Sequence, residues 1–272
     1  MKKILSLLVA FGMVASMTAC AAQSSSVAES TAPESEASSA SSEEAATSEA
    51  AAATAGTVLT HDEYMAADVD SEVTIETYVQ AKQSWWEDKA TVYGQSPDGA
   101  YFMYDMACSE EDYDKLTPGT CIRVTGYKSE WSGEIEIMDG TFEIVEDAEP
   151  FVAEPLDVTD LLGTDELIDH QNELVSFKGL TVEPSTVEGS DEEYAYLYNW
   201  DGSGTDGDDL YFNASYNGQT YTFTIESYLC DNTTDVYAAV KNLQVGQTID
   251  MEGFLYWYEG VNPHITSVTV EG

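Results

Sequence analysis

Two stretches of the sequence decide the fold: residues 116–133 read LTPGTCIRVTGYKSEWSG, and residues 243–260 read LQVGQTIDMEGFLYWYEG. They align without a gap at an offset of 127 residues. Each copy is typical of a helix end, a glycine turn, a strand, a second glycine and an aromatic loop. An internal repeat this long indicates two copies of one domain rather than a solenoid. The identical pairs are Leu116 with Leu243, Gly119 with Gly246, Ile122 with Ile249, Gly126 with Gly253, and Gly133 with Gly260.

The residues around the first copy predict a β-rich domain. Thr60-His61-Asp62-Glu63 is a capping-box pattern that predicts a short helix, and Ser109 is placed to cap another one. Elsewhere, apolar and polar residues alternate with the period of a half-buried strand. The predicted strands are residues 72–82, 89–95, 100–108, 121–128 and 134–145.

The second copy has similar surroundings with insertions. A helix-like segment at residues 158–170 precedes a strand at 173–183, in which the apolar phase changes at Gly179 and predicts a bulge. Asn217-Gly218 is a strong hairpin signal. A second helix is predicted at residues 233–243, and the other predicted strands are residues 194–200, 209–216, 219–227, 247–256 and 263–270.

This order of elements resembles the OB-fold, a five-stranded Greek-key barrel. An immunoglobulin-like sandwich is the alternative, but the helix between the third and fourth strands disfavours it. We therefore expect a mainly β chain with two tandem OB-fold-like five-stranded barrels and short helices, following a disordered N-terminal tether. The expected domains are residues 57–150 and 151–272.

The N-terminal segment has the pattern of a secretory leader. Lys2 and Lys3 precede an apolar stretch, residues 4–15, that is too short for a membrane span. Met17-Thr18-Ala19-Cys20 resembles the lipobox of bacterial lipoproteins, in which the cysteine is lipidated. The resemblance implies a signal peptide at residues 1–20, palmitate or a related acyl chain on Cys20, and a lipid anchor on the extracytoplasmic face of the cell membrane. An ordinary secretory leader is the alternative.

The composition is strongly acidic. The whole chain has a formal net charge of −42, and residues 57–272, with 45 acidic and seven basic residues, carry about −38. A phosphate backbone is repelled by such a charge, so we expect no nucleic-acid partner. Residues 21–56 consist almost entirely of Ser, Ala, Glu and Thr, and this composition predicts the disordered tether.

The cysteines other than Cys20 favour a packing role. Cys108 and Cys230 both fall just before the helix of their copy, and a residue type shared at one structural position favours burial. A Cys108–Cys121 disulfide is the alternative, which an exported protein permits.

No metal, cofactor or catalytic pattern is present. His61, His170 and His264 lie in no ligand spacing, so we expect neither a metal nor a cofactor. The acidic loop at residues 201–209 resembles calcium-binding loops only loosely, and a solvated hairpin loop is the favoured interpretation over a calcium site. The sequence also lacks the G-x-S-x-G, S-x-x-K and H-E-x-x-H motifs and a phosphate-binding loop.

The aromatic residues provide the ligand-binding hypothesis. In the OB-fold, ligands meet the barrel face and the loops that join strands one–two and four–five. Exposed aromatic rings at such loops form a stacking platform for flat ligands, although aromatic residues more often serve packing. The candidate ligand-binding residues are Trp85, Trp86, Trp131, Tyr256, Trp257, Tyr258 and His264.

The function that these patterns favour is non-catalytic binding of a carbohydrate or a peptide by a membrane-anchored extracytoplasmic lipoprotein. One alternative is a structural or interaction protein of the cell envelope that packs on a partner protein, which predicts a contiguous apolar patch. The other is an enzyme of unrecognised type, which requires polar groups that converge in a pocket, for instance carboxylates around His264. Burial of all four tryptophans, Trp85, Trp86, Trp131 and Trp257, would eliminate the aromatic platform.

Overall fold

The computed structural model describes residues 56–271, which belong to one compact unit. The predicted signal peptide at residues 1–20, the lipidation at Cys20 and nearly all of the predicted tether at residues 21–56 lie outside the described residues. None of the described helices is long and apolar enough to cross a membrane.

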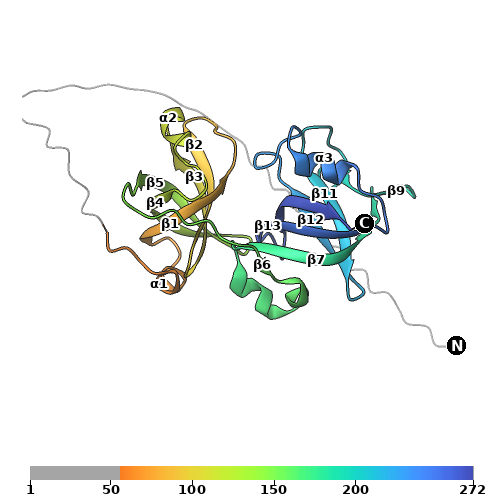
Figure 1. Ribbon diagram of the computed structural model, residues 1–272, viewed down its shortest axis with the longest axis horizontal. Helices are drawn as coiled ribbons and strands as arrows, with labels where there is room; N and C mark the ends of the chain where they lie inside the picture. Colours follow the sequence, from red (N-terminus) through yellow and green to blue (C-terminus); the bar gives the residue numbers. More distant parts are fainter. Residues whose placement is uncertain (1–55, 272) are drawn as a thin grey trace, which may run out of the picture. The chain divides into compact units, whose positions relative to one another are not determined.

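The first half of the described chain is a closed five-stranded barrel (Figure 1). Its strands are joined in the order β1-β2-β3-β5-β4, and β4 returns to pair with β1. Only β3 and β5 are parallel; the other pairs are antiparallel. A short helix, α1 (His61–Ala66), precedes the barrel and has the predicted capping box, and α2 (Glu110–Tyr113) connects β3 to β4. The strands are β1 (Glu72–Lys82), β2 (Lys89–Ser96), β3 (Gly99–Ala107), β4 (Cys121–Trp131) and β5 (Glu134–Ile144).

The second half repeats this barrel (Figure 1). β7 pairs with β13 on one side and β11 on the other, and β12 pairs with β14 in parallel, as β3 does with β5. The helix α3 (Asp235–Lys241) takes the place of α2. The barrel strands are β7 (Leu174–Glu183), β11 (Leu210–Tyr216), β12 (Gln219–Ile225), β13 (Thr248–Phe254) and β14 (His264–Val270). The prediction of a mainly β chain with two OB-fold-like five-stranded barrels is confirmed.

The insertions in the second barrel form small elements. The segment predicted as helix-like at 158–170 consists of two 3₁₀ helices, η1 (Thr159–Leu161) and η2 (Asp165–His170). The predicted strand at 194–200 is wrong as a continuous element, because it is divided between β9 (Glu193–Tyr194) and β10 (Leu197–Tyr198). β9 pairs with β8 (Ser185–Thr186), while β10 and β6 (Leu156–Asp157) extend the barrel sheet at its two ends.

The glycines of the repeated stretch have matching structural causes. Gly119 and Gly246 adopt nearly the same left-handed conformation, with φ of 89° and 88°, in the turn before β4 and β13. Gly126 and Gly253 lie at register shifts in their strands, where a Cβ atom would approach a backbone oxygen of the neighbouring strand to 2.8 and 2.3 Å. Any side chain at these two positions would therefore push the paired strands apart.

Each barrel encloses its own hydrophobic core. Ile75, Val92 and Met103 are fully buried in the first core, and the aromatic rings of Phe177 and Phe223 meet edge to face in the second, 5.2 Å apart. Cys108, Cys121 and Cys230 are free and buried. The packing interpretation of these cysteines is therefore confirmed, and the alternative of a Cys108–Cys121 disulfide is wrong.

Candidate functional site

A third hydrophobic cluster lies outside both barrel interiors and joins them. Tyr93 on β2 and Phe102 on β3 alternate with residues of the first core, so their side chains point out of the first barrel. There they meet Phe254 at the end of β13; the ring centroids of Tyr93 and Phe254 are 4.5 Å apart and stacked. These rings fix the contact from which the candidate site extends.

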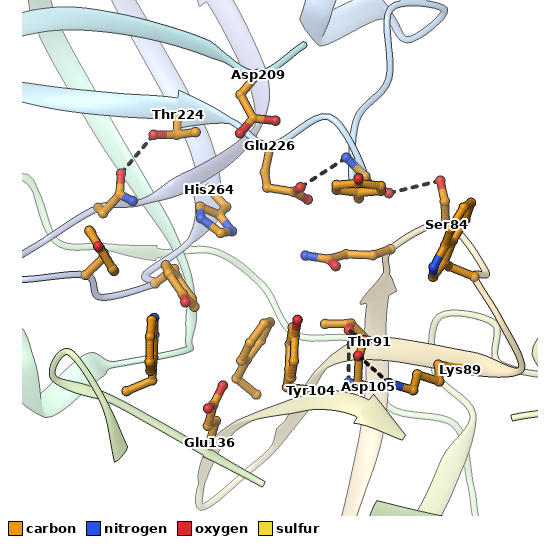
Figure 2. Close-up of a pocket in the computed structure, with 18 of the residues that line it drawn as sticks. Ser84, Lys89, Thr91, Tyr104, Asp105, Glu136, Asp209, Thr224, Glu226 and His264 are labelled. Carbon is orange, nitrogen blue, oxygen red and sulfur yellow. Dashed lines mark hydrogen bonds and ion pairs between the residues drawn. The ribbon is translucent and has the colours of Figure 1, made fainter. Parts of the chain in front are cut away.

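A cavity of about 830 Å³ lies beside this cluster and is lined by side chains from both barrels (Figure 2). Its volume is within the usual range for small-molecule sites. Backbone hydrogen bonds between the barrels hold two of the loops that surround it. The N–H of Ser84 donates to the carbonyl of Tyr228 at 2.7 Å, and the N–H of Glu259 donates to the carbonyl of Ser132 at 2.8 Å.

Two exposed tryptophans stand on the rim of the cavity for the same local reason. Trp86 directly precedes the turn residues Glu87 and Asp88, both of which have positive φ; Trp131 directly precedes Ser132 and Gly133, which also have positive φ. Two-residue turns of this type reverse the chain tightly, so the flanking tryptophans sit at the ends of paired strands. Trp86 and Trp131 remain 66% and 58% exposed. Tyr104, Tyr228 and Tyr258 add further exposed rings to the cavity wall.

His264 and Tyr256 form an aromatic floor. Their rings are stacked with centroids 4.3 Å apart, and the Tyr93 hydroxyl is hydrogen-bonded to Nδ1 of His264 at 2.7 Å. His264 is only 6% exposed, and burial lowers its pKa to about 3. The imidazole is therefore neutral at physiological pH and contributes no positive charge to the cavity.

Two glutamates with raised pKa values face the cavity from different barrels. Glu226 follows β12, and its two carboxyl oxygens accept hydrogen bonds from the N–H groups of Tyr228 and Leu229, at 3.1 and 2.8 Å. Burial, more than the nearby Asp209, raises its pKa to about 7. Glu136 on β5 is 5% exposed, and burial followed by the charge of Asp105 raises its pKa to about 7. Both groups titrate near neutral pH.

A third glutamate, Glu134, lies fully buried at the junction of the barrels. Its Oε2 atom accepts the N–H of Trp257 at 2.9 Å, while its Oε1 atom and Oδ1 of the neighbouring Asn172 both lack a donor among the described residues. The amide nitrogen of Asn172 donates to the carbonyl of Ile135 at 3.2 Å. Burial raises the pKa of Glu134 to about 8, more than the neighbouring Asn172 side chain and the N–H of Trp257 lower it, and a protonated carboxyl can donate a hydrogen bond from Oε1.

The structure brings five of the seven predicted ligand-binding residues to the cavity: Trp86, Trp131, Tyr256, Tyr258 and His264. None of the four tryptophans named for the platform is buried. The hypothesis of an aromatic platform therefore survives the criterion set from the sequence.

The other two predicted residues have structural contacts instead and do not line the cavity. The indole N–H of Trp85 donates to the carbonyl of Cys108 at 2.9 Å. The ring of Trp257 covers Gly133, where a Cβ atom would come within 2.8 Å of its Cδ1 atom. Trp257 thus packs one barrel on the other.

The prediction from the sequence considered mainly the loops of the barrels, and it missed several residues of the cavity. Tyr104 and Glu136 lie within predicted strands of the first barrel, and Glu226 lies at the end of one in the second. Their positions in the strand alternation could have identified them as outward-facing residues. Their convergence depends on how the two barrels pack, which the alternation does not specify.

Among residues 56–271, no group of three or more His, Cys, Asp or Glu side chains could hold a metal ion. In the acidic loop, Asp206 pairs with Lys241, and Asp201 and Asp208 accept backbone N–H groups of the loop itself, at 3.0 and 2.8 Å. These aspartates stabilise the loop conformation.

Comparison with protein-family models gives no match, and comparison with curated proteins gives none either. Solved structures with a similar fold include the p204 HINb domain, at 10% identity over 75% of this chain and 100% of that chain, with a TM-score of 0.34. The Ifi202 HINa domain in complex with 20-bp double-stranded DNA has 13% identity over 74% of this chain and 98% of that one, with a TM-score of 0.33. A Replication Protein A heterotrimer bound to single-stranded DNA has 12% identity over 74% of this chain and 49% of that one, with a TM-score of 0.31. The likeness concerns the OB-fold.

The comparison with solved structures contradicts the expectation that nucleic acid is not a partner, and this expectation is wrong. The similar structures include a HIN domain in complex with double-stranded DNA and a Replication Protein A heterotrimer bound to single-stranded DNA. The net charge of the chain acts on the phosphate backbone of a nucleic acid. Stacking of bases on aromatic side chains is a separate contribution, which net charge does not remove.

Proposed function

We propose that the protein is a non-catalytic binding module that holds a carbohydrate in the cavity between its two barrels. The observation that carries the proposal is the combination of exposed indole rings, Trp86 and Trp131, with buried carboxyl groups in one cavity. The flat faces of aromatic rings stack on the apolar faces of sugar rings, and carboxyl, hydroxyl and amide groups bond the sugar hydroxyls. Thr224 and Asn262, whose side chains are hydrogen-bonded to each other at 2.8 Å, supply such polar groups.

A carbohydrate suits the cavity better than a peptide. Extended peptides commonly bind by adding a strand to an exposed sheet edge, where backbone hydrogen bonds supply affinity. The first barrel is closed, and in the second β7 pairs with β11, so the five barrel strands of each described half pair with neighbours on both sides; only the two-residue strands β6 and β10 end the second sheet. Recognition in the cavity thus depends on side chains, which matches a ligand rich in hydroxyl groups.

The test is a binding screen with the purified full chain, using immobilised glycans, peptides and oligonucleotides as separate arms. We expect glycans to bind, and we expect Trp86→Ala and Trp131→Ala each to weaken the binding about five- to thirtyfold, from loss of a stacking contact of about 1–2 kcal/mol. Trp200→Ala is the matched control, because Trp200 is 75% exposed and does not line the cavity. Binding of only peptides or oligonucleotides overturns the carbohydrate proposal. Failure of every arm favours the alternative of an envelope protein that packs on a partner protein.

A second candidate function, hydrolysis of the bound carbohydrate, is favoured by one observation. The pKa values of Glu136 and Glu226 are both raised to about 7, so each carboxyl group is available as an acid and as a base near neutral pH. Glycoside hydrolysis uses a pair of carboxyl groups in these roles. Release of new reducing ends from a bound glycan, abolished by Glu226→Gln, would establish it; an intact glycan after prolonged incubation supports non-catalytic binding.

We further propose that the module acts outside the cell membrane through a lipid on Cys20. The lipobox-like residues 17–20 and the tether-like composition of residues 21–56 support this placement. Cys20→Ser removes the acceptor thiol, and we expect the variant to move from the membrane fraction to the soluble fraction. Equal membrane retention of the variant and the wild type contradicts the proposed anchor.

A further inference from the structure

Glu136 is a carboxyl group without a protein partner at the edge of a cavity. Its side chain is 5% exposed, and burial and the charge of Asp105 act on it, while no described residue donates a hydrogen bond to it. Figure 2 shows the carboxyl group directed from β5 into the cavity. The carboxyl oxygens of Glu136 are not among the buried polar atoms that lack a hydrogen-bond partner, so they face the open space of the cavity, where a bound group can pair with them.

The strands next to Glu136 surround it with aromatic side chains. Glu136 pairs with Phe102 on β3 and with Ser129 on β4. Side chains two residues apart on a strand share a face, so Tyr104 and Trp131 lie on the same face as Glu136, one on each side. Both residues line the cavity, and Tyr256 faces them from the second barrel.

The cavity has negative charge in excess of positive charge. Its lining includes five acidic residues and one basic residue, Lys89. The ammonium group of Lys89 is already paired with Asp105 at 2.9 Å, and His264 is neutral. The lining acidic residues other than Asp105 are Glu87, Glu136, Asp209 and Glu226.

We propose that the ligand enters this cavity with a cationic nitrogen, an ammonium group that sits against Glu136 between the rings of Tyr104, Trp131 and Tyr256. A cation gains binding free energy from both the ring faces and the carboxylate, whereas a neutral hydroxyl group gains it only from a hydrogen bond. The inference rests on the proposed use of the cavity as the ligand site. Applied to the proposed carbohydrate, it selects amino sugars over their neutral counterparts.

The test uses two small probes that differ only in charge. Choline and 3,3-dimethylbutan-1-ol have the same shape, and the charge of choline does not depend on pH. Calorimetric titration of the full chain should give an affinity for choline at least about tenfold above that for the neutral alcohol. Glu136→Gln keeps the size of the side chain and should reduce this difference severalfold without changing the weak binding of the alcohol, because the aromatic rings remain. Glu130→Gln makes the same charge change at an exposed position on the opposite face of β4 and should preserve the difference.

The outcomes separate this inference from the proposed function. Equal affinities for the two probes, no choline binding, or an unchanged preference in Glu136→Gln each overturn the inference. A parallel titration with glucosamine oligomers and N-acetylglucosamine oligomers tests the sugar. If only the acetylated oligomers bind and the two probes have equal affinities, the carbohydrate function stands and the proposed cation site at Glu136 is refuted. A choline preference that depends on Glu136, without binding of any glycan, refutes the carbohydrate function and supports the cation.

Discussion

The buried pair of Glu134 and Asn172 makes the stability of the chain depend on pH in a specific direction. Burial raises the pKa of Glu134 from 4.5 to about 8, so the folded chain retains a proton that the unfolded chain releases. The stabilisation by this proton is complete below pH 4.5 and is lost as the pH rises to 8. At about 1.4 kcal/mol per pKa unit, the loss amounts to about 3–5 kcal/mol.

Replacing Glu134 with Gln tests this reasoning. The amide of Gln mimics the protonated acid: its oxygen accepts the N–H of Trp257, and its nitrogen supplies a donor in place of the protonated Oε1. We expect the free energies of unfolding of the variant and the wild type to agree within about 1 kcal/mol at pH 5, whereas at pH 9 the variant should be more stable by about 3–5 kcal/mol.

The assay is urea unfolding, followed by tryptophan fluorescence, at pH 5, 7 and 9. The difference between the two proteins cancels the contributions of Glu136 and Glu226, whose pKa values are raised in the same direction. Glu154→Gln, at an exposed position, serves as the control and should follow the wild type. A Glu134→Gln variant with the pH dependence of the wild type, or one that is strongly destabilised at pH 5, would refute a protonated Glu134.

Three further predictions concern other contacts in the structure. Gly133→Ala places a methyl group 2.8 Å from Cδ1 of Trp257 at a φ of 95°, and should lower the free energy of unfolding by about 1–3 kcal/mol in urea titrations; an unchanged midpoint contradicts the close packing. Tyr93→Phe removes the partner of His264 Nδ1 and should cost about 1–3 kcal/mol in the same assay, whereas an equally stable variant would show that the hydrogen bond contributes nothing. Thiol titration of the mature protein should detect three reactive groups after denaturation and almost none before it, because the three described cysteines are buried and free; a fourth group would mean that Cys20 is not lipidated.

Much of the barrel architecture could be predicted because strand alternation and turn chemistry are local. The register shift opposite Lys178 and Gly179 matches the predicted bulge, and Asn217 and Gly218 have the positive φ values of the predicted hairpin turn. The repeated glycines were equally informative, because the paired strands approach closely at Gly126 in one barrel and at Gly253 in the other. Each of these features depends on a few neighbouring residues.

The cavity could be predicted only in part, because it depends on the contact between the barrels. Glu134 and Glu136 alternate with Ile135 and Ile137, a pattern that normally places carboxylates in solvent. In the structure both glutamates are buried: Glu134 accepts the N–H of Trp257 from the second barrel, and Glu136 lines the cavity between the barrels. Trp86 and Tyr258 could be predicted as ligand-binding candidates from the sequence, because aromatic residues in barrel loops are unusual however the two barrels pack.

The central claim is that the cavity between the barrels is the ligand site, and a crystal structure of the chain with the tightest ligand from the binding screen tests it most directly. Electron density for the ligand is predicted in the cavity, with its ring stacked on Trp86 or Trp131 and a polar group within hydrogen-bonding distance of Glu136. Ligand density at another surface, with this cavity filled only by water, would contradict the claim.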